Sequence, residues 1–412
     1  MSQKLKSQSL RSYINQMHYS SKEECAVALL YLFVLCPYVL MLIRAILVRL
    51  GMGFATDFLV SSIWIITIFV ALKYIKSKLK ILDILLIICW VGLYFWTGIK
   101  HPERRELLKL SQDVFLYSSV PLYFLGLAFN YKRHQNILFW TSVISLITYI
   151  FFVYAFSSGL SQGQLKEDNN LALAYAILPS VLLLVLFCLE EYSLFKLVLS
   201  IVGVFLLLTL GSRGPVVCCI LFFAVYLLFF REYRYNVLGK TIILVVSAIV
   251  YCFVDVICLV LSNISSMIGM SSRVFDSVLN NSFANFHNSN ARDEIIGTLI
   301  PYIKSDATGW GYGLMADRFF TKYGEYSHNL FVEVLISFGR VGGVIVLMIL
   351  FFIILKSFIR MKIRGYRGIL LVFFCSSIIQ LMFSNSFITC NWLYLYLGFV
   401  VGALRIKVYE EL

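Results

Sequence analysis

Three residues with the charge or proton chemistry of a catalytic site stand beside polar stretches of an otherwise apolar chain. Arg213 lies in a Gly-Ser-Arg-Gly-Pro turn, Arg292 opens an amphipathic stretch, and His328 precedes a long apolar run. A guanidinium offers a planar fork of donors that matches phosphate oxygens. A histidine, with an unperturbed pKa of about 6.5, can act as a general base. Together these residue types indicate chemistry on a phosphate-bearing substrate.

Each of the three residues also has an ordinary structural explanation. A short turn needs glycine and proline, and the arginine within it, Arg213, can extend to lipid headgroups. Arg292 taken singly is a solvated charge, and His328 is an interfacial histidine near a helix start. What favours the functional interpretation is that all three are expected to face one compartment.

Four further residues are candidates for substrate binding. Asn329 and Glu333 follow His328 closely enough to orient it or the substrate, since Glu333 lies about one helical turn further along. Trp310 and Tyr312, in a Gly-Trp-Gly-Tyr-Gly turn, present aromatic rings that can stack on a sugar. A lone glycine-aromatic turn is also a common loop element, so this pattern gains meaning only beside the others.

One further candidate is a charge inside an apolar run, and the sequence has no metal-binding pattern. Arg340 lies within the run after His328, where a charge is costly and is usually paired or functional. Glu333 is its expected partner, which favours a structural ion pair over a substrate contact. No Asp-x-Asp pattern, histidine cluster or Cys-x-x-Cys pair occurs. We therefore expect chemistry without a metal or cofactor.

The composition places these residues in a membrane protein. The chain of 412 residues is 60% apolar, far above soluble domains. Its apolar runs approach the ~20 residues that a helix needs to cross about 30 Å of hydrocarbon. The net charge of +13 comes from short basic clusters between these runs, so the expected partner is the lipid bilayer and not nucleic acid. We predict an all-α polytopic membrane protein with a single integral membrane domain, residues 1–412.

Hydropathy predicts about twelve membrane spans. They are Ala26–Val48, Ala55–Leu72, Leu79–Gly98, Asp113–Phe129, Asn136–Phe156, Leu171–Leu189, Leu194–Leu210, Pro215–Phe230, Thr241–Leu261, Asn329–Leu355, Gly368–Ile388 and Trp392–Leu404.

The long polar segment 262–328 separates the ninth span from the tenth, and the distribution of lysine and arginine places it outside. Cytoplasmic loops retain basic residues, and the loops on the side of both termini are rich in them. The opposite side has one local exception, which comprises Lys100, Arg104, Arg105 and Lys109. Both termini are therefore expected in the cytoplasm. Within the outer segment, apolar residues recur at helical spacing from Arg292 to Ile303, which predicts an amphipathic helix on the membrane or over the bundle.

The order of these motifs resembles the bacterial O-antigen ligase and Wzy-type polymerase superfamily. The resemblance covers about Leu206 to Gly343, and the motifs are a Ser-Arg-Gly turn, an external arginine, a Gly-x-Gly turn and His-Asn-x-x-x-Glu followed by Gly339 and Gly342. The first half of the chain agrees only in topology. The family implies a GT-C-like fold, with short helices in the large extracytoplasmic loop.

The resemblance also implies a mechanism. Members are inverting, metal-independent glycosyltransferases that use undecaprenyl-diphosphate-linked oligosaccharides as donor and acceptor in the bacterial inner membrane. By this resemblance Arg213 and Arg292 hold the diphosphate leaving group, and His328 takes the proton from the acceptor hydroxyl on the extracytoplasmic side. A chain-length regulator protein is a further expected partner.

Three functions are consistent with the sequence. We favour a polymerase that joins repeat units into O-antigen or capsular polysaccharide, because only the sparse core motifs match and polymerases are the more divergent members. The alternative within the family is a ligase that transfers glycan to lipid A core in lipopolysaccharide biosynthesis. A flippase for lipid-linked oligosaccharides is the alternative from another class. The large external segment argues against it, since transporters usually place their binding residues along broken helices.

Overall fold

The computed structural model describes residues 79–155, 167–209, 213–230, 290–321, 324–361 and 364–405, with a few isolated residues outside these ranges. Every regular element in these ranges is a helix. The α-helices are α5 (Ile81–Lys100), α6 (Arg105–Val114), α7 (Val120–Leu127), α8 (Tyr131–Ala155), α9 (Glu167–Glu190), α10 (Leu194–Thr209), α11 (Arg213–Val225), α14 (Asn290–Ser305), α15 (Ala316–Phe320), α16 (Leu330–Arg360), α17 (Arg364–Phe374) and α18 (Asn391–Arg405). Shorter turns are the 3₁₀ turn η2 (Pro102–Arg104) and the π-helical turns η3 (Phe115–Ser119), η5 (Tyr226–Phe230) and η7 (Cys375–Ile379).

Three of the described helices are long and apolar enough to cross a membrane. They are α5, α9 from Leu173, and α16. Large apolar side chains remain exposed along two of them, such as Phe95 and Ile99 on α5 and Phe351 and Phe352 on α16. Exposed apolar surface of this extent is expected where a helix faces lipid. The fold is therefore that of an all-helical membrane protein.

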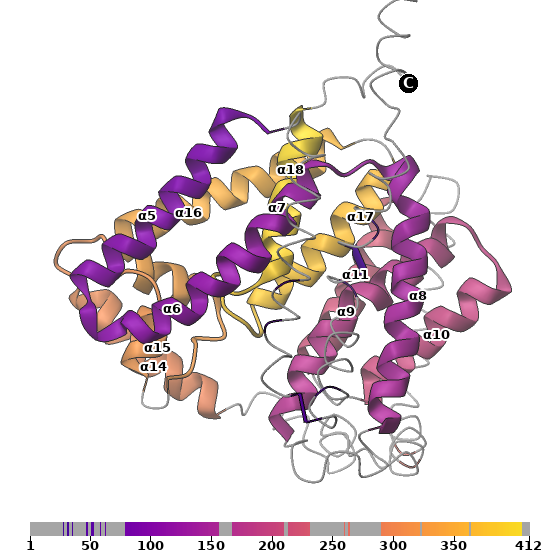
Figure 1. Ribbon diagram of the computed structural model, residues 1–412, viewed down its shortest axis with the longest axis horizontal. Coiled ribbons are helices and arrows are strands. Elements are labelled where there is room, and N and C mark those ends of the chain that lie inside the picture. Colours follow the sequence, from indigo (N-terminus) through magenta and orange to yellow (C-terminus); the bar gives the residue numbers. More distant parts are fainter. Residues whose placement is uncertain are drawn as a thin grey trace, which may run out of the picture.

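The centre of the molecule is built from helices that approach one another closely. In Figure 1, α7 and α18 lie between the group α5, α6 and α14 to α16 and the group α8 to α11. A side chain at Gly126 of α7 would come within 2.4 Å of the Leu395 carbonyl, and one at Gly398 of α18 within 2.0 Å of the Tyr123 carbonyl. Glycine is required at both positions because it lets two helix backbones touch. On the other side, α8 and α10 both pack against the buried helix α9.

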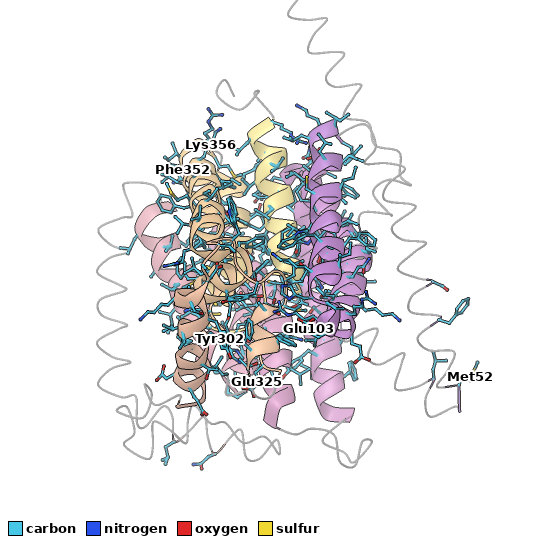
Figure 2. The ribbon with its side chains drawn as sticks, turned by 90° about the vertical axis from the view of Figure 1, so that its left-hand side faces the viewer. Met52, Glu103, Tyr302, Glu325, Phe352 and Lys356 are labelled. Atoms are coloured by element: carbon cyan, nitrogen blue, oxygen red, sulfur yellow. The ribbon has the colours of Figure 1, made fainter. Side chains whose placement is uncertain are left out.

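The molecule has two distinct ends. Figure 2 shows Glu103, Tyr302 and Glu325 at one end, which we call the loop end, and Lys356 at the opposite end. At the opposite end the buried Asp83 of α5 accepts hydrogen bonds from both Arg405 terminal nitrogens, each at 2.7 Å. The Tyr123 hydroxyl, also at 2.7 Å, donates to the same carboxylate. This ion pair joins α5, α7 and α18.

Most of the predicted spans that fall in the described part of the chain coincide with helices, but two of them are interrupted, Asn329–Leu355 at Gly339 and Gly368–Ile388 near its end. The span Gly368–Ile388 was expected as one helix, whereas the regular helix ends just after η7 and residues 382–390 form a buried turn. We call it the 382–390 turn. Asn385 has a φ of 71°, which a continuous helix does not allow. The predicted spans Ala26–Val48, Ala55–Leu72 and Thr241–Leu261 lie outside the described residues.

Candidate functional site

Helix α16 is broken at Gly339, and the Gly-Trp-Gly-Tyr-Gly stretch fills the break. Gly339 has φ 75° and ψ 178°, which interrupts the helical hydrogen bonds on either side of it. We call residues Gly309–Gly313 the glycine turn. Its Tyr312 and Gly313 N–H groups donate to the Ile336 and Ser337 carbonyls at 3.0 and 2.9 Å. The backbone groups freed by the break are therefore satisfied by the segment of residues 306–321, as buried polar groups require. We call this segment the loop.

Glycine is required in this contact for two reasons, the close approach of the two backbones and the positive φ angles. A side chain at Gly311 would lie 2.2 Å from the Gly339 nitrogen, and one at Gly339 would lie 2.2 Å from the Gly309 carbonyl oxygen. All three glycines of the turn have positive φ values, between 71° and 82°. The sequence pattern that we interpreted as a sugar-stacking turn is thus first of all the attachment of the loop to α16.

The two aromatic residues of the glycine turn have different surroundings. Trp310 is 61% exposed and lies over Gly342, where an added side chain would be 3.1 Å from its ring. Tyr312 instead packs edge-on against Phe320 at 5.0 Å between ring centroids, and its hydroxyl donates to the Tyr302 carbonyl at 3.2 Å. Both remain predicted substrate contacts, and Trp310 is the more accessible ring.

Arg340 bonds to the loop and not to Glu333. Its Nη2 donates to the Asp306 carbonyl oxygen at 3.0 Å, and among the described residues no ion pair joins Arg340 to Glu333. The predicted pairing is therefore wrong. The two residues lie on either side of the Gly339 break, so the continuous helical face on which the prediction relied does not exist. The Asp306 carboxylate itself accepts hydrogen bonds from the Gly311 N–H at 2.8 Å and from the Thr308 hydroxyl at 2.7 Å.

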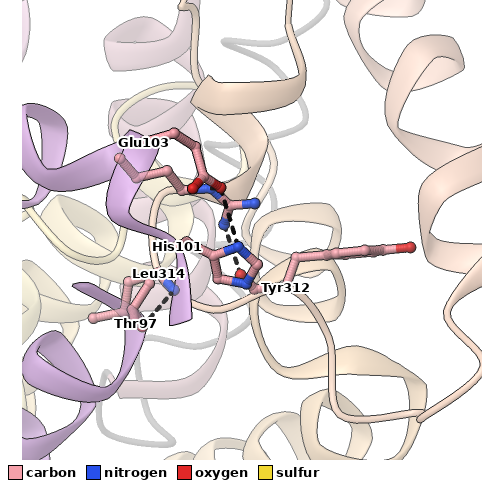
Figure 3. A network of polar contacts seen from close by, with 6 residues as sticks. Thr97, His101, Glu103, Tyr312 and Leu314 are labelled. Carbon is pink, nitrogen blue, oxygen red and sulfur yellow. Dashed lines mark hydrogen bonds and ion pairs between the residues drawn. The ribbon is translucent and has the colours of Figure 1, made fainter. Parts of the chain in front are cut away.

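Arg104 is a buried cation that the sequence analysis did not single out beyond its place in a basic cluster. It is 1% exposed, and its Nη1 donates to the Tyr312 carbonyl at 2.6 Å. Figure 3 shows Tyr312 together with the nearby Glu103 and His101. Its guanidinium lies 4.6 Å from the Phe319 ring centroid and 5.3 Å from that of Phe320. Cations are attracted to aromatic faces at such distances. Arg104 therefore holds the glycine turn and α15 to the end of α5.

His328 lies in a turn that two neighbouring residues fix. It has a φ of 52°, an unusual value for a residue with a side chain. Its ring lies 4.1 Å from the Tyr326 ring, centroid to centroid. The preceding Ser327 N–H donates to the buried Asp317 carboxylate at 2.9 Å. Burial raises the pKa of the Asp317 carboxyl, although hydrogen bonds from Ser327 and Arg318 oppose the shift.

Asn329 and Glu333 contact other parts of the protein. The Asn329 side chain accepts from the Phe331 and Val332 N–H groups and so caps the start of α16, a common role for asparagine. Glu333 is 1% exposed, and its carboxylate accepts from the Ser386 hydroxyl and from the Phe387 N–H. Glu333 thus holds the 382–390 turn in place. Whether either residue also contacts substrate stays a prediction.

The 382–390 turn connects His328 with the start of α11, where Arg213 lies. The Tyr326 hydroxyl is 3.3 Å from the Ser384 hydroxyl. On the other side of this turn, a side chain at Gly214 would come within 3.2 Å of the Phe383 Cβ. Arg213 precedes Gly214 by one Cα to Cα step of about 3.8 Å. The backbone of Arg213 is therefore separated from Tyr326 by a short series of packed residues, although its side chain is outside the described part of the structure.

Arg292 lies in the first turn of α14, which packs on α16. Ile295 and Leu299 of α14 form a small apolar cluster with Ala316 of α15 and Ile336 of α16. The expected amphipathic helix is therefore present, and it packs against α16 at the loop end. The side chain of Arg292, like that of Arg213, is not among those described, so the meeting of the two arginines with His328 stays a prediction.

Arg318 is a further cation close to His328 that the sequence analysis did not identify. Its guanidinium carbon lies 5.3 Å from the centre of the Tyr326 ring. Within the described residues its side chain forms no hydrogen bond and no ion pair. No regular spacing in the sequence distinguishes Arg318 from an ordinary solvated charge, and only the fold brings it to the Tyr326 ring.

The fold and this site define a polytopic α-helical membrane protein with a loop docked on a broken span, and comparison with protein families gives a match over part of the chain. Residues 197–347 match a protein-family model described as O-antigen ligase. The resemblance to the O-antigen ligase and polymerase superfamily is thereby confirmed for this part of the chain, which contains all the predicted site residues. No curated protein and no solved structure matches the chain.

Proposed function

We propose that the chain is a polyprenyl-diphosphate-dependent polymerase that joins lipid-linked oligosaccharide repeats into O-antigen or capsular polysaccharide. It acts on the outer face of the bacterial cytoplasmic membrane, with its loop end outside and both termini in the cytoplasm. The donor and the acceptor are both linked to undecaprenyl diphosphate, and a chain-length regulator is an additional partner. The family match to O-antigen ligase over 197–347 supports this class of enzyme.

The reaction is a single displacement at the anomeric carbon of the donor glycan. His328 accepts the proton of the acceptor hydroxyl while that oxygen bonds to the anomeric carbon. The bond from this carbon to the diphosphate breaks at the same time, and the leaving diphosphate keeps the electron pair. Arg213 and Arg292 stabilise that negative charge, and Arg318 adds a third cation beside Tyr326. Attack from the face opposite the leaving group inverts the configuration, and the arginines carry the charge that a metal would otherwise neutralise.

The observation that carries this proposal is the position of the 382–390 turn. Phe383 packs against Gly214, next to Arg213, and Ser384 contacts Tyr326, whose ring lies against His328. One buried turn therefore touches the segments that present the predicted general base and one of the predicted phosphate ligands. Glu333 fixes the same turn from α16, which gives the arrangement the rigid support that a catalytic site needs.

A ligase is the second candidate, because the matching family model is described by that activity. In a ligase the same three residues transfer a finished glycan to lipid A core. The two reactions differ only in the acceptor, and the described residues hold no feature that selects between a second lipid-linked repeat and a core sugar. A flippase gains no support from the family match.

The test is replacement of His328 or Arg213 by alanine in the native strain, followed by gel analysis of the surface polysaccharide. Loss of a general base lowers the rate about 10²- to 10⁴-fold. A polymerase then gives core with a single repeat in place of the ladder, whereas a ligase gives core without any repeat. His101→Ala is the matched control, because His101 also lies at the loop end and its side chain is hydrogen-bonded to the nearby Glu103.

Two results would contradict the proposal. An unchanged ladder in His328→Ala, with normal amounts of protein in the membrane, removes His328 from catalysis. Activity of wild-type membranes that disappears with a chelator and returns with a divalent ion contradicts the metal-independent mechanism.

A further inference from the structure

A groove at the loop end of α5 is not used by the proposed reaction. It lies between α5 and α6 and has a volume of about 260 Å³. Phe95 and Ile99 of α5 and Leu108 of α6 give it an apolar wall, and Arg105 and Lys109 of α6 give it two cations. An apolar wall with a pair of positive charges is suited to a ligand that has both an anionic group and a hydrocarbon chain.

The two cations have no carboxylate partner in the part of the chain that the structure describes. Arg105 and Lys109 are four residues apart on α6, so they face the same side of the helix. Like charges at this spacing destabilise a helix, and both side chains are exposed. Of the nearby acids, Glu103 is hydrogen-bonded to His101. The pair therefore presents two positive charges to the groove, which an anion would neutralise.

The groove faces away from the loop. Residues two apart on a helix point in nearly opposite directions, because each residue turns by about 100°. Thr97 is fully buried and accepts a hydrogen bond from the Leu314 N–H at 3.3 Å. Phe95 and Ile99, on the other side of α5, are 62% and 77% exposed. Because α5 is long and apolar enough to span a membrane, this exposed side faces lipid, and its end lies at the level of the headgroups.

We propose that this groove binds the headgroup phosphate of an anionic phospholipid of the bilayer. Arg105 and Lys109 contact the phosphate, and Phe95, Ile99 and Leu108 contact the first part of a hydrocarbon chain that continues into the membrane. The same cations are the local exception to the usual depletion of basic residues on the predicted outer side. A bulk phospholipid fits better than the lipid-linked substrate, since the groove opens on the lipid-facing side of α5 while Thr97 on the other side holds the loop.

The first test changes the charge. Full-length protein, purified in detergent and freed of lipid, is titrated with phosphatidylglycerol, and bound lipid is counted by native mass spectrometry. The double variant Arg105→Gln, Lys109→Gln should bind at least about tenfold more weakly, because each basic residue near a membrane surface contributes measurably to the attraction of anionic lipid. Lys356→Gln with Arg360→Gln is the matched control, since these exposed cations have the same spacing at the end of α16.

The second test fills the groove and keeps the charges. A Cβ at Gly98 would lie 3.7 Å from Leu108 Cδ1, an ordinary contact, so Gly98→Leu can fold with its side chain in the groove. Gly92→Leu is its control on the same helix, because a Cβ at Gly92 meets nothing within 4 Å. We expect loss of phosphatidylglycerol binding in the first variant and wild-type binding in the second.

Four outcomes would overturn the proposal. Wild-type binding in both the charge variant and Gly98→Leu shows that the groove holds no lipid. An equal loss in the Lys356 and Arg360 control shows unspecific attraction. Equal binding of phosphatidylcholine removes the role of the net negative charge. Displacement of phosphatidylglycerol by a lower concentration of polyprenyl monophosphate assigns the groove to the substrate lipid instead.

Discussion

Helix α5 carries or adjoins a buried charge at each end, and the two charges are held in different ways. At its start, Asp83 is completely paired, with two hydrogen bonds from Arg405 and one from Tyr123. At its other end, Arg104 has a carbonyl oxygen of Tyr312 and two aromatic rings as close partners. The nearest carboxylate oxygen, of Glu103, lies 4.0 Å from the Arg104 Nε.

The difference separates a part of the molecule that is held firmly from the part that contains the proposed catalytic site. A buried ion pair is costly to break, because the remaining charge is left without compensation. A cation held by one carbonyl and by aromatic faces loses less when its contacts change. Separating the three helices at the Asp83 end thus has a large free-energy cost. Releasing the loop at the Arg104 end has a smaller one.

The largest expected effect comes from the break in α16. Alanine at Gly339 would force its Cβ against the Gly309 carbonyl and require a positive φ. We expect the docking of the loop to lose about 4 kcal/mol or more, at the high end of single substitutions. Hydrogen exchange should show residues 306–321 unprotected, while the start of α5 stays protected. Gly92→Ala is the control, and a protected loop in Gly339→Ala contradicts the assignment.

The second prediction concerns the end of α5 at which Asp83 lies. Asp83→Asn removes the charge opposite Arg405 and should lower the free energy of unfolding by about 3 kcal/mol, measured by thermal unfolding in detergent. The double variant with Arg405→Gln should recover part of this loss, because no uncompensated charge remains. Wild-type stability in Asp83→Asn would mean that the two ends of α5 do not differ in the way described.

A smaller effect is expected at Arg104. Arg104→Met keeps an apolar stem against Phe319 and Phe320 but loses the hydrogen bond to the Tyr312 carbonyl, which should cost about 2 kcal/mol. The loss should appear as faster exchange in the glycine turn with little change in overall unfolding. Arg105→Met is the exposed neighbour that serves as control. A loss of global stability as large as that of Asp83→Asn would contradict the comparison.

The smallest effect is a pH dependence of the protection of the loop, to which two carboxyl groups contribute with opposite signs. Burial alone would raise the pKa of Asp306, but hydrogen bonds from Thr308 and Gly311 outweigh it and lower the pKa. Its contribution to the stability of the docked loop is present above the unfolded-state pKa of about 3.9. This contribution is lost as the pH falls through the folded-state pKa. The pKa of Asp317 is raised, first by burial. The contribution of Asp317 to the stability of the docked loop is present below about pH 3.9, the unfolded-state pKa. It is lost as the pH rises through the folded-state pKa.

Two variants separate these contributions. Asp306→Asn should remove the loss of loop protection at low pH, and Asp317→Asn should remove the loss at higher pH. Exchange of loop amides, corrected for the intrinsic pH dependence, measures both. The same sign of change in the two variants would show that the groups do not titrate as their surroundings imply.

The sequence predicts the helices better than their interruptions. Apolar runs locate α5, α10 and α18 closely, because a window of about 19 residues averages over a whole span. The same averaging hides the 382–390 turn, in which the Ser386 hydroxyl and the Phe387 N–H both donate to Glu333. A partner 53 residues away in the chain leaves no local signal, so the predicted span ran on to Ile388.

For the site, the sequence indicates which residues matter but not what each one contacts. The glycine turn is visible as a pattern, and its role in filling the break at Gly339 is not, since a glycine within an apolar run is compatible with an intact helix. Arg104 and Arg318 are ordinary charges in the sequence. They gain their roles only when Phe319 and Tyr326 are brought against them by the fold.

The break at Gly339 also has a consequence for how the protein is fitted to its membrane. The part of α16 from Arg340 to Arg360, at 1.5 Å per residue, is about as long as the hydrocarbon core is thick. If this part crosses the hydrocarbon, the turns before Gly339, which begin next to His328, lie above it. A span adapts to bilayers of different thickness by tilting, but here the loop is bonded on both sides of the break, to the Ile336 and Ser337 carbonyls before it and to the Arg340 side chain and Val341 N–H after it. A change in the tilt of α16 would therefore move the loop together with the span.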